Sequence, residues 1–210
     1  MYSRKSGLLI GFHGCDKETC DKVINGKTQL APSQNEYDWL GNGIYFWENN
    51  DRRAYQFSQE LMANPRPGKP IVINPAIIRA VIDLGNCLDL LDSEYLALVK
   101  DSYKTLEFSY KAFGITMPSN KKGKETNDLL LRNLDCAVIE NLHKDMLPNS
   151  FDSVRGVFWE GDDLYPKAGF KEKNHIQICI RNPNCIKGYF LPQKLNTSYK
   201  KVYDPFQLLV

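Results

Sequence analysis

The chain has 210 residues, of which 42% are hydrophobic and 25% are charged. This length suffices for one domain with a sizeable core, and the composition excludes a disordered tail protein and a fibrous repeat. Twenty-seven basic and 25 acidic residues leave a net charge of +2. The chain therefore lacks the basic excess of a protein that coats nucleic acid, although its charge is compatible with transient contact.

Apolar residues do not gather into a targeting or membrane segment. The apolar run at 8–10 is shorter than the core of a secretory signal, and no small-residue cleavage site follows it. No stretch approaches the roughly 20 apolar residues that span a bilayer. We therefore expect a cytoplasmic protein that does not associate with membranes.

The six cysteines predict reduced thiols and no metal site. The nearest pairs are separated by four residues (Cys15 and Cys20) and by five (Cys179 and Cys185), whereas zinc ligands usually form Cys-x-x-Cys pairs. Only three histidines are available as further ligands. In a reducing cytosol we expect mostly buried, free thiols.

The first elements expected along the chain are a strand and a short helix. Apolar residues alternate over 8–13, which predicts a strand whose last residue, His13, points away from the face of Phe12. Asp16 is a suitable cap for a helix that runs through Ile24, and Gly26 is a suitable end.

The most informative run of the sequence is WLGNGIYFWE. Gly41 and Gly43 allow a sharp turn and the close approach of a ligand. A strand over 44–47 is expected next, with Tyr45 and Trp47 on one face. The following residues, 51–63, carry the apolar stripe of a helix.

The rest of the chain mixes apolar runs with helical patterns, without an internal repeat or an interdomain linker. Expected elements are strands within 71–85, a helix over 88–113 capped at Asp92 or Ser93, a basic loop over 117–128, a helix over 127–146, and last strands over 154–161 and 175–182. The sequence thus predicts one α+β domain over residues 1–210, with a helical insertion at about 88–148.

Three of these elements occur in an order that resembles a known family. They are a strand that ends in Phe12-His13-Gly14, the run Gly41-Asn42-Gly43-Ile44-Tyr45-Phe46 followed by a helix, and a late strand with Gln177. This order resembles the ADP-ribosyltransferases of the diphtheria-toxin-like, poly-ADP-ribose-polymerase-like branch, which place a His, a Tyr and a Glu on three such elements. The likeness covers about the first sixty and the last fifty residues, and it implies an ADP-ribosyltransferase-like split β-sheet core.

Two positions depart from the family pattern. Arg53 stands before Ala54 where the polymerase branch commonly has a Ser, and Gln177 stands in the place of the Glu. A Gln can hold a ribose hydroxyl by hydrogen bonds, but it cannot act as a general base. We therefore expect transfer of a single ADP-ribose unit, with Glu160 of the run FWEG as the candidate carboxylate.

The resemblance implies NAD as the substrate and a role for each matched residue. His13 would bind the adenine-side ribose, the Gly14 backbone the nicotinamide carboxamide, and the Tyr45 ring the face of the nicotinamide. Gln177 would hold the nicotinamide-side ribose while that ribose develops oxocarbenium character, and Glu160 would deprotonate the acceptor. Further residues expected to line the cofactor pocket are Gly43, Asn50 and Arg53.

The function that follows is NAD-dependent mono-ADP-ribosyl transfer to a macromolecule, as in an intracellular toxin of a toxin–antitoxin or phage-defence system. Nucleic acid, such as mRNA, is preferred over protein as the acceptor, and a neutralising antitoxin protein is the implied partner. Two alternatives stay open: an NAD glycohydrolase that transfers ADP-ribose to water, and a catalytically inactive binding module.

Taken one by one, the same residues favour ordinary structural roles. A single His at the end of a strand or a Tyr in an aromatic strand usually packs, and a charge in a loop is usually solvated. For Tyr55, and for the lysines of the basic loop (Lys121, Lys122 and Lys124), a solvated position is the preferred interpretation. Only the order of the matched residues favours the transferase.

Overall fold

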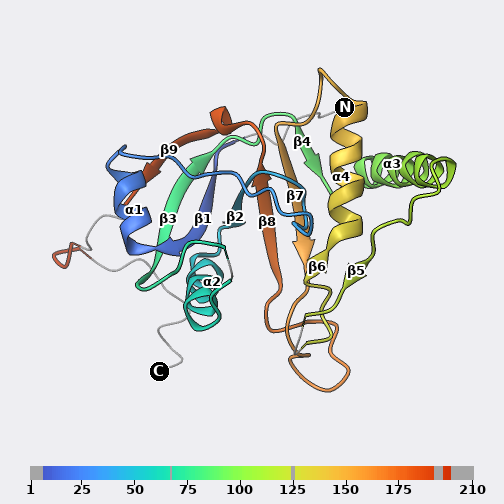
Figure 1. Cartoon of the computed structure of the whole chain (residues 1–210). Helices are drawn as coiled ribbons and strands as arrows, with labels where there is room; N and C mark the ends of the chain where they lie inside the picture. The colour runs from blue at the N-terminus through green and yellow to red at the C-terminus, as the bar shows by residue number, and fades with distance from the viewer. Residues whose placement is uncertain (1–6, 67, 124–125, 192–195, 200–210) are drawn as a thin grey trace.

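The computed structural model describes residues 7–66, 68–123, 126–191 and 196–199. Its main sheet contains seven strands: β1 (Leu9–Asp16), β2 (Ile44–Glu48), β3 (Pro75–Ile82), β4 (Cys87–Asp89), β7 (Ser153–Phe158), β8 (His175–Ile180) and β9 (Ile186–Phe190). The strand order is β4-β7-β8-β2-β1-β3-β9 (Figure 1). All neighbours are antiparallel except β4 and β7. The protein is therefore a mixed α/β fold with a large, mostly antiparallel sheet, which agrees with the α+β prediction.

Within the described ranges, four α-helices accompany the sheet: α1 (Lys17–Ile24), α2 (Asp51–Ala63), α3 (Ser93–Ala112) and α4 (Asn133–Asp145). A short pair of strands, β5 (Asn120–Lys121) and β6 (Leu131–Arg132), precedes α4, and a 3-10 turn at Pro183–Cys185 precedes β9. None of the helices in the described ranges is long and apolar enough to cross a membrane.

The two faces of the sheet carry separate hydrophobic cores. On one face, α1 contributes Cys20 and Val23 to a core with inward residues of β2, β3 and β8. On the other face, α4 contributes Ile139 and Leu142 to a core with Leu88, Val154 and Cys179. Helix α2 covers the β1 and β3 half of this second face, and α4 covers the β4 and β7 half (Figure 1). Strands β2 and β8 therefore lie between the two helices.

Local capping explains why the first helices begin where the sequence predicts. The side chain of Asp16 accepts a hydrogen bond from the Glu18 amide at 2.8 Å, and Asp92 caps α3 in the same way. Helix α2 begins and ends where the prediction placed it, and Asn50 is its cap. These three predictions are confirmed.

Three predictions about the middle and the end of the chain are wrong. Helix α4 begins at Asn133, six residues later than expected, because its first amides bond to the side chain of Asn120, which is remote in sequence. The segment around Leu88 is strand β4, paired with β7, so the expected insertion at 88–148 begins inside the main sheet. Strand β9 was not predicted, and it pairs with β3 at the edge of the sheet.

The burial of the cysteines agrees with the prediction of mostly buried thiols. All six are free, and all except Cys87 are buried. Burial raises the pKa of the Cys15 thiol to about 12, so this group stays protonated at neutral pH. In the part of the chain that the structure describes, no group of His, Cys, Asp and Glu side chains is arranged to hold a metal ion.

Candidate active site

The strands that carry His13, Tyr45 and Gln177 are neighbours in the sheet. Strand β2 lies between β1 and β8, although these three strands come from opposite ends of the chain. Tyr45 pairs with Cys179 and Trp47 pairs with Gln177, so these side chains share one face of the sheet. The predicted alternation along β2 and β8 is therefore confirmed, and the three strands lie side by side in the sheet.

His13 differs from the other two residues in the face that it occupies. It pairs with Ile78, and its ring packs edge-on against Phe46 at a centroid distance of 5.8 Å, in the core of the opposite face. His13 therefore points away from the face of Phe12, as predicted, but it is not the last residue of the strand, which continues to Asp16. The ring reaches the seam between β1 and β2, where its Nδ1 lies 2.8 Å from the Tyr45 carbonyl oxygen.

At this seam the pairing between β1 and β2 is short. Strand β1 pairs with β3 from Leu9 to Asp16, but its register with β2 covers only Gly11 and Phe12. Beyond this point the imidazole of His13 occupies the Tyr45 carbonyl that a strand amide would otherwise use. Burial lowers the pKa of His13, so its ring is neutral, its Nδ1–H donates, and its Nε2 carries a free lone pair.

The ring of Tyr45 is fixed by its hydroxyl group. This hydroxyl donates to the Gly41 carbonyl at 2.7 Å and accepts from the Leu40 amide at 2.9 Å. Burial raises the pKa of Tyr45 well above 10, which keeps the phenol protonated. Both hydrogen-bonding functions are therefore used inside the protein, and what remains for a ligand is the face of the ring.

The glycines that were expected to contact a cofactor are in close contact with the protein itself. A Cβ at Gly14 would lie 2.2 Å from the Ala54 carbonyl oxygen, so this glycine lets α2 approach β1. A Cβ at Gly43 would lie 2.5 Å from the Cys179 sulfur. Gly41 has a φ of 78°, which agrees with the predicted sharp turn. Their contact with a cofactor stays a prediction.

Arg53 and Glu160 form a buried ion pair that the sequence did not predict. The Nη2 atom of Arg53 lies 3.2 Å from Oε2 of Glu160, and both residues are less than one-tenth exposed. The guanidinium group also lies over the Trp47 ring, 5.7 Å from its centroid. His175 completes the group, since its Nδ1 lies 3.8 Å from the same carboxylate oxygen. We call these four residues the Arg53 cluster.

Burial governs the charges in the Arg53 cluster. It raises the pKa of the Glu160 carboxyl, and the neighbouring Arg53 opposes this shift. It lowers the pKa of His175 to about 4, so the ring is neutral at physiological pH. Glu160 is therefore not the solvated loop charge that its position alone suggested, but a carboxylate held by one arginine in a nearly dry setting.

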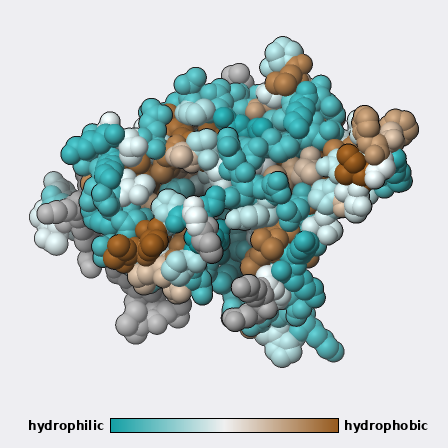
Figure 2. All heavy atoms as spheres, viewed as in Figure 1, coloured by the Kyte–Doolittle hydropathy of each residue, from teal (hydrophilic) through white to brown (hydrophobic). Residues whose placement is uncertain are grey.

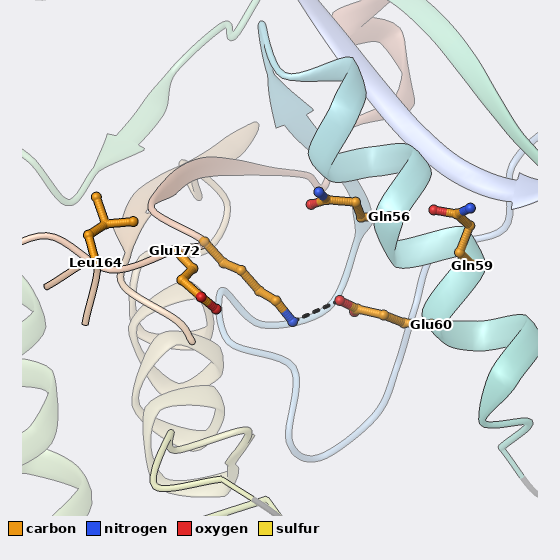
Figure 3. Close-up of a pocket in the computed structure, with 6 residues that line it drawn as sticks. Gln56, Gln59, Glu60, Leu164 and Glu172 are labelled. Carbon is orange, nitrogen blue, oxygen red and sulfur yellow. Dashed lines mark hydrogen bonds and ion pairs between the residues drawn. The ribbon is translucent and has the colours of Figure 1, made fainter. Parts of the chain in front are cut away.

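A cavity of about 500 Å³ lies beside the Arg53 cluster, between α2 and the loop that joins β7 to β8. Figure 2 shows the surface hollowed between the lobe of α2 and the lobe of β5 and β6. Glu60 reaches from α2 across the cavity to Lys173, with its Oε1 2.9 Å from Nζ (Figure 3). Glu60 also contacts Arg53 at 3.5 Å, so the cavity and the cluster share this residue. The cavity is lined by Gln56, Gln59, Glu60, Leu164, Glu172 and Lys173.

The other predicted residues have simpler surroundings. Asn50 caps α2 through its side chain, which accepts from the Arg53 amide at 3.0 Å. Tyr55 and the basic-loop residues Lys121 and Lys122 are exposed, in agreement with the solvated interpretation. Lys124 lies outside the described residues. His13, Tyr45 and Gln177 do not line the cavity beside the Arg53 cluster, so a shared hollow around all three stays a prediction.

Comparison with known proteins finds a distant relative. The chain is 28% identical over 197 residues to an uncharacterized protein of Methanocaldococcus jannaschii, in an alignment that covers 84% of this chain and 83% of the relative. No family model matches the chain. No solved structure matches it.

Proposed function

We propose that this protein is an NAD-dependent mono-ADP-ribosyltransferase, which breaks the bond between nicotinamide and ribose and transfers ADP-ribose to an acceptor. The observation that carries the proposal is the adjacency of β1, β2 and β8, which carry His13, Tyr45 and Gln177 from opposite ends of the chain. Tyr45 and Gln177 share one face, and the His13 ring is bonded to the Tyr45 backbone.

Each group offers a function that NAD needs. The neutral His13 can accept a hydrogen bond from a ribose hydroxyl through Nε2, and the fixed Tyr45 ring offers an apolar face for the nicotinamide. Gln177, half-buried beside Trp47, can hold the second ribose. Glu160 supplies the carboxylate that Gln177 lacks, and acts as the base toward the acceptor.

The biological setting extends the same proposal. An enzyme of this kind that acts inside its own cell would need a neutralising antitoxin protein, and its acceptor would be a macromolecule such as mRNA. The exposed lysines Lys121 and Lys122 stand on the lobe opposite α2 and are available for transient contact with phosphate. Incubation with labelled NAD and several classes of polymer identifies the class of the acceptor.

The proposal is tested with NAD labelled in its adenylate phosphate, incubated with the purified protein and with RNA, DNA or cell lysate. We expect release of nicotinamide and label in one class of polymer. Tyr45→Ala removes the ring and is expected to abolish release, whereas Tyr45→Phe keeps the ring and loses only the bonds to Leu40 and Gly41. Thermal unfolding of both variants reports whether they fold. Absence of nicotinamide release by the parent protein would contradict the proposal.

A further inference from the structure

Three nitrogen atoms of the Arg53 cluster are buried without a hydrogen-bond partner in the described part of the protein. They are Trp47 Nε1, Arg53 Nε and His175 Nε2. The three residues are 3%, 6% and 5% exposed, and each unsatisfied buried group costs free energy. One further such nitrogen, in His143, lies apart in α4. An accumulation of three in one cluster indicates a place built for a polar ligand atom.

The hydrogen-bonding character of the three nitrogens is determined by their chemistry. Trp47 Nε1 and Arg53 Nε carry hydrogens and can only donate. The Nδ1 atom of His175 lies 2.6 Å from the Lys173 carbonyl oxygen, which can only accept, so Nδ1 carries the proton. Since the ring is neutral, Nε2 is an acceptor. The cluster therefore offers two donors and one acceptor.

A hydroxyl oxygen matches this set. It accepts two hydrogen bonds through its lone pairs and donates one through its hydrogen. An ammonium or guanidinium group has no acceptor to offer the two donors, and it would face the positive charge of Arg53. A carboxylate has no hydrogen to offer His175. The cluster thus discriminates between acceptor chemistries.

We propose that Trp47, Arg53 and His175 bind the acceptor of the reaction as a hydroxyl group, of water or of an alcohol, next to the Glu160 carboxylate. This inference rests on the proposed function. The bond between the nicotinamide nitrogen and the ribose carbon breaks, and nicotinamide leaves as a neutral molecule with the bonding electron pair. The hydroxyl oxygen bonds to that carbon, and its proton passes to Glu160 and then to solvent.

The cavity between α2 and the β7–β8 loop provides the approach to this site. Its wall residue Glu60 contacts the Arg53 guanidinium, and its wall residue Lys173 accepts the Nδ1–H of His175 through its carbonyl oxygen. Figure 3 shows Glu60 extended from α2 toward this side of the cavity. The Glu60 side chain, which is bonded to Nζ of Lys173, lies between the cavity and the buried nitrogens and has to move before an alcohol group reaches them.

The first experiment offers the purified protein three acceptors together with NAD: water enriched in oxygen-18, methanol, and agmatine, which carries a guanidinium and an amine. Mass spectrometry identifies the products. We expect ADP-ribose that carries oxygen-18 and, with methanol, its methyl riboside. An agmatine adduct as the main product would overturn the hydroxyl assignment, while leaving the proposed transfer from NAD intact.

The second experiment changes the cluster with matched controls. His175→Asn keeps a donor for the Lys173 carbonyl and removes the Nε2 acceptor, and Trp47→Phe keeps a ring and removes the donor. Each is expected to slow the release of nicotinamide roughly tenfold, the effect of one lost hydrogen bond, with unchanged NAD affinity. His143→Asn makes the same change in a buried histidine whose Nδ1 lies 2.8 Å from the Ile139 carbonyl oxygen, and it should have no effect.

The outcomes separate the two proposals. Calorimetry measures the affinity for NAD, which does not involve the acceptor. If both variants, His175→Asn and Trp47→Phe, bind NAD and release nicotinamide at the rate of the parent protein, this inference alone is overturned. Failure to bind or cleave NAD would overturn the proposed function and this inference with it. Loss of folding in Trp47→Phe, seen by circular dichroism, leaves His175→Asn to decide the question.

Discussion

Each face of the main sheet carries a buried arginine between carboxylates, but the two arginines are satisfied to different extents. Arg155 donates from Nε and Nη2 to Glu48 at 2.5 and 3.0 Å, and from Nη1 to Asp89 at 3.2 Å. These carboxylates raise its pKa. Arg53, on the opposite face, contacts Glu160 and Glu60 at 3.2 to 3.5 Å and leaves its Nε unused.

The difference shows which of the two arginines keeps unused hydrogen-bonding capacity. A guanidinium with short bonds to two carboxylates binds strands β2, β4 and β7 together, and this is a structural role. The guanidinium of Arg53 makes longer bonds and leaves one donor unused. It lies next to a cavity and two further unpartnered nitrogens, and this arrangement leaves hydrogen-bonding capacity for a ligand atom. Burial alone would not distinguish the two.

The largest expected effect concerns stability. Arg155→Met removes the guanidinium group that bonds to the carboxylates of Glu48 and Asp89, and it should lower the free energy of unfolding by about 3–5 kcal/mol. Arg53→Met should cost less than half as much, because Glu160 can take up a proton. Urea unfolding of both variants gives the comparison. Equal losses would show that Arg53 has the same structural role as Arg155.

An intermediate effect follows from the approach of α2 to the sheet. Gly14→Ala places a Cβ 2.2 Å from the Ala54 carbonyl oxygen, so α2, which carries Arg53, must shift. We expect a loss of about 1–3 kcal/mol, as for other overpacked sites, together with loss of NAD cleavage. Gly188→Ala is the control, since a Cβ there meets no atom within 4 Å. Unchanged NAD cleavage in Gly14→Ala would show that activity does not depend on the position of α2.

The smallest expected effect is a displacement of the pH dependence. Glu160 acts as a base only when ionised, so nicotinamide release should rise with pH through its pKa, which burial raises above the usual range for glutamate. Arg53 lowers this pKa, so Arg53→Met should move the rising limb to higher pH. Glu160→Gln should remove the limb. An unshifted limb in Arg53→Met would mean that another group titrates.

Much of the secondary structure could be predicted from the sequence because the patterns that determine it are local. The alternation over 44–47, the stripe over 51–63 and the cap at Asp16 each depend on neighbours within one or two turns, and all three predictions are confirmed. The start of α4 was missed because its cap, Asn120, comes from outside the helix. Long-range capping leaves no pattern within the helix itself.

The candidate site was readable in its parts and not in its arrangement. The face shared by Tyr45 and Gln177 follows from alternation, whereas the orientation of His13 depends on where β1 and β2 stop pairing. The pair of Arg53 with Glu160 joins residues 107 positions apart. The signal that could have suggested it is the charge of Arg53 on the apolar side of α2, which needs a buried partner.

The most direct test of the account is a crystal structure of the protein with a non-hydrolysable NAD analogue. We expect the nicotinamide ring against the face of Tyr45, its ribose within hydrogen-bonding distance of Gln177, and the adenine-side ribose at Nε2 of His13. A dinucleotide bound elsewhere on the molecule, or none bound at millimolar concentration, would contradict the account.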